Sequence, residues 1–132
     1  IWKLQLAALK HFMNGDFSKV TQLLDQATAL EESLPPPSGP PDLIKPTHEL
    51  YGEILLFLDR PKEAQHQFER ALLWHPNRAR SVLGLARAAA QLGHIQVTRQ
   101  AYANFLNIWN QADPDLPELR EAKDFLEKTD KL

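Results

Sequence analysis

Histidine side chains are the first candidates for chemistry in this sequence, because an imidazole can ligate a metal or transfer a proton near neutral pH. The 132-residue chain has five of them, His11, His48, His66, His75 and His94, and no cysteine. A helical zinc site uses two histidines four residues apart, and no pair has that spacing here. No aspartate or cysteine completes a metal pattern around them. The sequence therefore predicts neither a metal site nor a cofactor.

Motifs for catalysis are missing as well. The chain contains no G-x-S-x-G nucleophile turn, no phosphate-binding Walker loop and no H-E-x-x-H zinc motif. The carboxylates are spread over predicted helix faces that water can solvate, and their pairing in space stays open. We therefore expect a protein that is not an enzyme.

The composition is that of an ordinary globular chain, with 43% hydrophobic and 24% charged residues. Fifteen Lys and Arg residues stand against 17 Asp and Glu residues, which gives a net charge of −2. This balance lacks the basic excess of proteins that bind nucleic acids or membrane surfaces, so we expect neither as a partner. The chain opens at Ile1 without an initiator methionine, which favours a processed product or a piece of a longer protein.

Apolar residues recur at intervals of three and four along almost the whole chain, as Leu50, Ile54, Phe57 and Leu58 show. The alternation typical of strands is absent, so the sequence predicts an all-α fold. Gly, Pro and Asn residues break the pattern into seven helices. We expect these over about 2–13 and 17–32, from 46, 61 and 79 onward, and over about 95–111 and 117–128. They group into three antiparallel pairs followed by a single helix.

Residues 45–78 carry a set of small and bulky side chains at characteristic intervals. Its members are His48, Tyr51, Gly52, Leu55, Ala64, Phe68, Ala71 and Pro76. A glycine or alanine lets two helices approach closely, and the large residues fill the space between them. One helix pair cannot bury its apolar face alone, so such pairs are expected to stack.

The same spacing recurs on both sides of this unit. A shift of 34 residues gives a unit at 79–112, with Ala86 at the position of Gly52 and Tyr102 at that of Phe68. Removal of the Pro-rich insertion 35–44 gives another at 1–34. The matching residues there are Ala8, Gly15, Phe17 and Ala27.

This pattern resembles the tetratricopeptide repeat (TPR) family, whose W-x2-L-G-x2-Y, A-x3-F and closing Pro have the same spacing. The stretch from Pro41 to Phe125 is also similar to C-terminal segments of bacterial TPR proteins. The resemblance implies a single domain over 1–132, folded as a right-handed α-solenoid of three antiparallel helix pairs plus a capping helix at 117–128. It also implies a non-catalytic scaffold whose concave groove holds a peptide or helix of a partner protein.

The resemblance implies which residues line that groove, on the first helix of each pair. They are Gln5, Leu9, Phe12 and Met13, then Glu49, Glu53, Leu56 and Phe57, then Arg80, Leu83, Arg87 and Gln91. The groove would then have an apolar section from the first unit, an acidic section from the second and a basic section from the third. This arrangement fits an amphipathic partner segment. Alternatively, Glu53 pairs with Arg87 and Glu49 with Arg80. Exposed pairs of this kind contribute only about 0–1 kcal/mol, so a ligand can still exchange with them.

Charge is distributed unevenly towards the C-terminus. Residues 79–112 contain three arginines and no acid, whereas residues 113–132 contain four basic and seven acidic residues. This complementarity predicts that the last helix covers the preceding unit. The functional alternative is an arginine-lined groove for an acidic segment.

We expect a protein–protein interaction module. The alternative is a structural or oligomerisation domain of a larger protein without a peptide ligand of its own. An RNA reader is disfavoured, because base-reading polar pairs do not recur from unit to unit. Trp2 has no preceding repeat to cover it, so we also expect weak self-association through residues 1–13. Residues 37–40 fit P-x-x-P, although a stiff connection is the favoured interpretation.

Overall fold

The computed structural model describes residues 1–35 and 45–130, so the P-x-x-P segment lies outside the described residues. Within them the secondary structure is entirely helical, which confirms the all-α prediction. The helices are α1 (Trp2–Met13), α2 (Phe17–Ser33), α3 (Thr47–Phe57), α4 (Pro61–Trp74), α5 (Ala79–Gln91), α6 (Ile95–Ile108) and α7 (Pro117–Thr129). The predicted bounds agree within one residue except in α6, which ends three residues before the expected Gln111. No helix in these ranges has the length and hydropathy that crossing a membrane requires.

Three tight turns join α1 to α2, α3 to α4 and α5 to α6. The middle residue of each turn, Gly15, Asp59 or Gly93, has a positive φ of 59–78°. Such a residue ends a helix because its left-handed backbone turns the following N–H back towards the last carbonyls. In each turn that N–H donates to the carbonyl five residues earlier, Asp16 to His11, Arg60 to Leu55 and His94 to Ala89.

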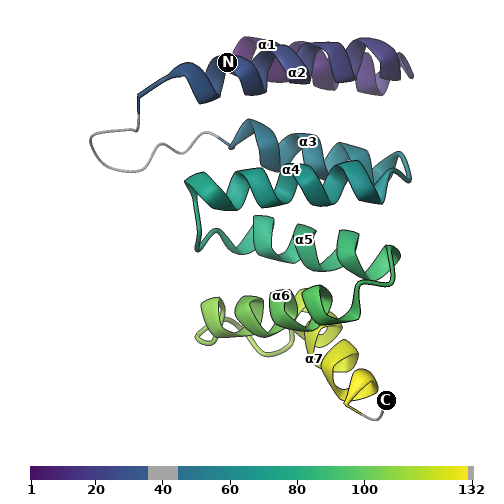
Figure 1. Ribbon diagram of the computed structural model, residues 1–132, viewed down its shortest axis with the longest axis vertical. Helices are drawn as coiled ribbons and strands as arrows, with labels where there is room; N and C mark the ends of the chain where they lie inside the picture. The colour runs from purple at the N-terminus through teal and green to yellow at the C-terminus, as the bar shows by residue number, and fades with distance from the viewer. Residues whose placement is uncertain (36–44, 131–132) are drawn as a thin grey trace.

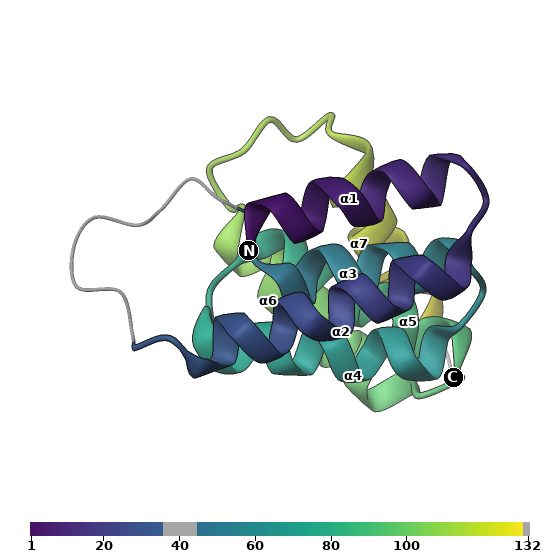
Figure 2. The same ribbon diagram turned by 90° about the horizontal axis from the view of Figure 1, so that it is seen from above.

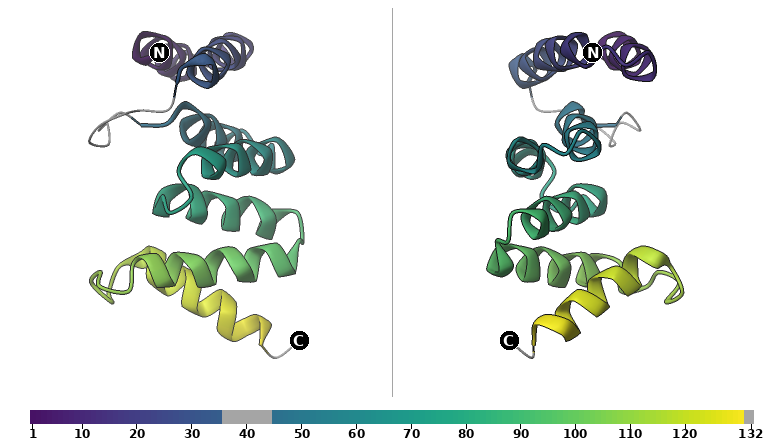
Figure 3. Two further views of the ribbon diagram at one scale, coloured as in Figure 1. Left: turned by 60° about the vertical axis from the view of Figure 1, so that its left-hand side comes forward. Right: turned by 90° about the vertical axis from the view of Figure 1, so that its right-hand side faces the viewer.

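The helices are stacked along one axis, with α1 and α2 at one end and α7 at the other (Figure 1). Each helix packs against the next one in the chain, and α3 also contacts α5. Seen along the stack, the axes of α1 to α4 are roughly aligned, with successive helices antiparallel within each pair (Figure 2), whereas α7 crosses the end of the stack obliquely (Figure 3).

Phe68 on α4 is the central side chain of the core between the second and third hairpins. Its ring is fully buried and lies against Gly52 of α3 and Gly84 of α5. A Cβ at Gly52 would lie 2.7 Å from Cζ of Phe68, and a Cβ at Gly84 would come closer still. The two glycines therefore set how closely α3, α4 and α5 approach one another.

Candidate functional site

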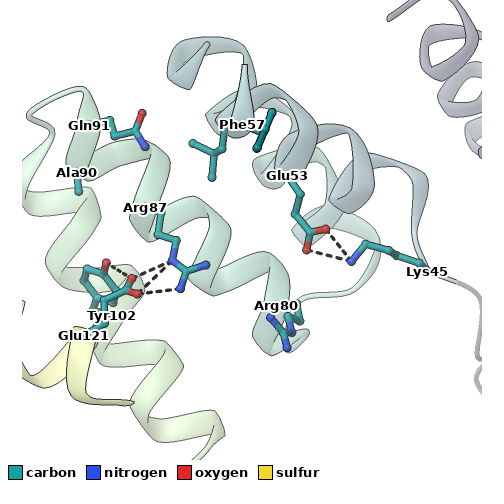
Figure 4. Close-up of a pocket in the computed structure, with 10 residues that line it drawn as sticks. Lys45, Glu53, Phe57, Arg80, Arg87, Ala90, Gln91, Tyr102 and Glu121 are labelled. Atoms are coloured by element: carbon teal, nitrogen blue, oxygen red, sulfur yellow. Dashed lines mark hydrogen bonds and ion pairs between the residues drawn. The ribbon is translucent and has the colours of Figure 1, made fainter. Parts of the chain in front are cut away.

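An open groove of about 890 Å³ lies between α3, α5 and α7 (Figure 4). Its walls mix charged, aromatic and aliphatic side chains from several parts of the chain. The lining residues are Lys45, Glu53, Leu56, Phe57, Arg80, Arg87, Ala90, Gln91, Tyr102 and Glu121.

Helical spacing brings these side chains onto one face. Glu53 and Phe57 are one turn apart on α3, and Arg80 and Arg87 are two turns apart on α5, so each pair projects in nearly the same direction. Lys45 comes from the segment just before α3. The groove thus runs along two neighbouring helices, with α7 closing one side.

On the α7 side of the groove, two side chains bind the carboxylate of Glu121. The Arg87 guanidinium donates to both carboxylate oxygens of Glu121, at 2.8 and 2.9 Å, and the Tyr102 hydroxyl donates to the same carboxylate at 2.6 Å. Burial raises the pKa of Glu121, but the hydrogen bonds from Arg87 and Tyr102 outweigh it and hold that pKa below its ordinary value. Burial and the neighbouring Glu121 carboxylate raise the pKa of the Tyr102 hydroxyl. Glu121 is therefore a carboxylate bound in its charged form.

A second cluster of charged side chains lies where the first turn of α3 meets the start of α5. Glu49 is fully buried, and it accepts hydrogen bonds from Nε and Nη2 of Arg78, at 2.6 and 3.1 Å, and from the Ser81 hydroxyl at 2.6 Å. The Lys45 ammonium lies 3.3 Å from Glu49 and 2.8 Å from Glu53. Burial raises the pKa of Glu49, but the bonds from Arg78 and Ser81 and the Lys45 charge bring the net pKa below its ordinary value.

Two groups in the groove remain open to a ligand. Arg80 is exposed and makes no ion pair with any residue in 1–35 or 45–130. The Phe57 side chain is 74% exposed, although one edge of its ring meets Phe12 at a centroid distance of 5.1 Å. The groove therefore offers a cation near the start of α5 and an aromatic surface at the end of α3.

No protein-family model matches this sequence, and no curated protein matches it. The groove has an exposed ring, ion pairs along its walls and, among the described residues, one lining cation without an ion pair. In the described part of the chain, no group of three or more His, Cys, Asp or Glu side chains is arranged to hold a metal ion.

The structure brings together only part of the predicted groove. Glu53, Leu56, Arg80 and Arg87 line it, together with Phe57 and Gln91. Leu9 and Phe12 instead lie on α1, partly buried against the core formed by α1 to α5. The α1 helix therefore does not contribute to this groove.

Three predicted groove residues are buried, and for them the prediction is wrong. Leu83 is fully buried in the core of α5 to α7, and Glu49 is fully buried in its cluster of charged side chains. Gln5 is buried because its amide donates to the Thr47 hydroxyl at 2.8 Å and to the Lys45 carbonyl at 2.9 Å. Gln5 and Glu49 join neighbouring hairpins and Leu83 fills a core, which leaves none of the three a surface for a partner.

The predicted ion pairs are also wrong, although charge pairing itself occurs. Glu53 pairs with Lys45 and Arg87 with Glu121, because these groups are nearer than the acid or base on the adjacent helix. The complementarity of the last helix with the unit before it is confirmed by Arg87 and by Arg99, which binds the Leu126 carbonyl and the Asp130 carboxylate.

Four groove residues, Lys45, Ala90, Tyr102 and Glu121, were not predicted from the sequence. Glu121 enters the groove through the position of α7, which follows a turn-rich segment after α6, whereas Tyr102 reaches the groove from α6 itself. The acidic excess of residues 113–132 was the one signal that α7 brings a carboxylate to this face.

Proposed function

We propose that the chain is a TPR-like solenoid whose three hairpins, 1–34, 45–78 and 79–112, are equivalent units with α7 as a cap. Equivalent turn geometry supports this, because Gly15, Asp59 and Gly93 occupy the same position of each unit. Burial supports it too, since four positions of the small-and-bulky pattern are buried in all three units. They are Ala8, Val20, Leu24 and Ala27, then Gly52, Ala64, Phe68 and Ala71, then Ala86, Thr98, Tyr102 and Phe105.

Equivalent polar contacts at the two junctions between hairpins give further support. Gln5 bonds the Thr47 hydroxyl, and Glu49 bonds the Ser81 hydroxyl. Glu49 and Ser81 stand at the positions of Gln5 and Thr47, one unit further along. The same pair of positions therefore ties each hairpin to the next.

We propose that the domain is a non-catalytic interaction module that binds a segment of a partner protein in the groove of α3 and α5. The observation that carries this proposal is the open groove in which Phe57 is exposed and Arg80 has no partner among the described residues. A solvated aromatic ring in a hollow is a favourable contact for an apolar side chain, because burial of both surfaces removes them from water.

Selection of binders from a displayed library of random 16-residue peptides tests this function. Peptides selected on the wild-type domain are expected to bind the Phe57→Ser variant about tenfold more weakly, because an aromatic anchor typically contributes more than 1 kcal/mol. Leu73→Ser is the matched control, since Leu73 is 70% exposed on α4 and lies outside the groove lining. Equal loss with both variants, or no loss with either, contradicts the groove as the binding site.

A second candidate function, self-association through α1, rests on a specific observation. Leu6 is 55% exposed, whereas Leu50 at the equivalent position of the next unit is 7% exposed because the first hairpin covers it. Trp2 and Met13 are exposed on the same helix. The outer side of α1 thus resembles a hairpin surface without its neighbour.

We expect weak dimerisation through this surface, with a dissociation constant on the order of 100 μM. The Trp2→Gln/Leu6→Gln variant should remain monomeric over the same concentration range, while Leu73→Gln should behave like the wild type. Sedimentation velocity or light scattering at increasing concentration measures this. A wild-type protein that stays monomeric at millimolar concentration eliminates the proposal.

A further inference from the structure

The acids that line the groove are already neutralised by the chain itself, and this decides which partner charge fits. Glu53 is paired with Lys45, and Glu121 is held by Arg87. Arg80 is the lining cation that has no ion pair within the described residues, so an acidic group is the complement that the groove lacks. A basic partner would meet Arg80 and find each carboxylate engaged.

The groove wall already binds one carboxylate that belongs to the chain itself. Arg87 and Tyr102 hold the Glu121 carboxylate of α7 through three short hydrogen bonds. Arg80 stands two turns before Arg87 on the same face of α5 and is exposed. A carboxylate from outside the chain can bind Arg80 in the manner in which Glu121 binds Arg87.

The apolar part of the groove lies at the opposite end from Arg80. Phe57 is the last residue of α3, and it lies towards the same end as Gln91, the last residue of α5 (Figure 4). Ten residues of α5 separate Arg80 from Ala90, which corresponds to about 15 Å of helix. Leu56 continues the apolar surface beside Phe57.

We propose that the partner is a peptide segment that places an Asp or Glu carboxylate on Arg80 and an apolar side chain on Phe57. This inference rests on the proposed function of the groove and specifies its ligand. The carboxylate belongs to a side chain within the segment, about 15 Å from the apolar anchor. That separation corresponds to about ten residues of a helical ligand or five of an extended one.

The composition of the peptides selected from the random library tests this inference. Binders of the wild-type domain are expected to be enriched in Asp and Glu over Lys and Arg, and the Arg80→Glu variant should reverse that enrichment. Arg120→Glu is the matched control, because the Arg120 side chain on α7 is 67% exposed and outside the groove lining. It should leave the enrichment unchanged.

Affinities of one selected peptide then locate the contact. Fluorescence anisotropy should show about fivefold weaker binding to Arg80→Gln, as expected for a charge pair at the rim of an interface. Replacement of the peptide's Asp or Glu by Asn or Gln should weaken its binding to the wild type by the same factor. The same replacement should not weaken its binding to Arg80→Gln any further.

The outcomes separate this inference from the function on which it rests. Peptides that depend on Phe57 but show no preference for acids, or keep that preference with Arg80→Glu, overturn the acidic ligand and leave the groove as a binding site. Failure to select any peptide that depends on Phe57 overturns both. Circular dichroism of each variant checks that the exposed substitutions leave the helices intact.

Discussion

Replacement of Gly84 by alanine is expected to lower the free energy of unfolding by about 3 kcal/mol, as overpacking of a close-packed core does. In an open helix the same change would stabilise by about 1 kcal/mol, because alanine has the higher helix propensity. The Phe68 ring makes the substitution destabilising in this protein. It is fully buried between Gly52 and Gly84, and a methyl group on Gly84 would overlap it. Chemical denaturation followed by circular dichroism measures the loss.

A second substitution shows whether the Phe68 ring is the cause. Phe68→Leu removes the ring edge that meets the new methyl group, although it leaves a cavity and is destabilising by itself. The double variant should therefore be more stable than the sum of the two single losses predicts, by about 1 kcal/mol or more. Strict additivity would show that Gly84 and Phe68 do not share this contact.

The contact between Gly84 and Phe68 could not be predicted from the sequence. The repeat interval placed Ala86 at the position of Gly52, and Ala86 is indeed fully buried. The residue that meets Phe68 across the next junction is nevertheless Gly84. The interval defines positions within a helix pair, whereas contact across a junction depends on how α5 crosses α4. That crossing follows from side-chain packing, which the spacing of small residues does not specify.

The helices themselves were predictable because local signals determine them. Periodic apolar residues defined each helix, and glycine or proline marked most of the ends. Glu53, Leu56, Arg80 and Arg87, which the repeat pattern predicts at a groove, line the groove between α3 and α5. The pairing of their charges was not predictable, because Lys45 and Glu121 reach the groove from a segment before α3 and from α7.

Glu49 was predicted to face the groove, and its burial leads to the second large effect. Glu49→Gln is expected to lower the free energy of unfolding at pH 7 by about 2 kcal/mol. Loss of one partner from a fully buried ion pair costs about 3–5 kcal/mol, because the remaining charge is then buried without a partner. The loss is smaller here, since the side chains of Arg78 and Lys45 are 38% and 36% exposed and can turn towards water. Urea denaturation of both proteins measures the difference.

The pH dependence of this difference identifies the carboxylate as its source. The net pKa of Glu49 is lowered in the folded protein, so its stabilisation is complete above the ordinary carboxyl pKa of about 4.3. It is lost as the pH falls through the lower pKa of the folded state. The difference in stability between the wild type and Glu49→Gln should therefore begin to shrink below about pH 5 and continue to shrink as the pH falls further. Glu53→Gln, which removes a partly exposed partner of Lys45, should cost less than about 1 kcal/mol at any pH. If both variants lose the same stability at pH 7, or the Glu49→Gln difference does not shrink as the pH falls from about 5 to 3, the ionic link between α3 and α5 does not stabilise the fold.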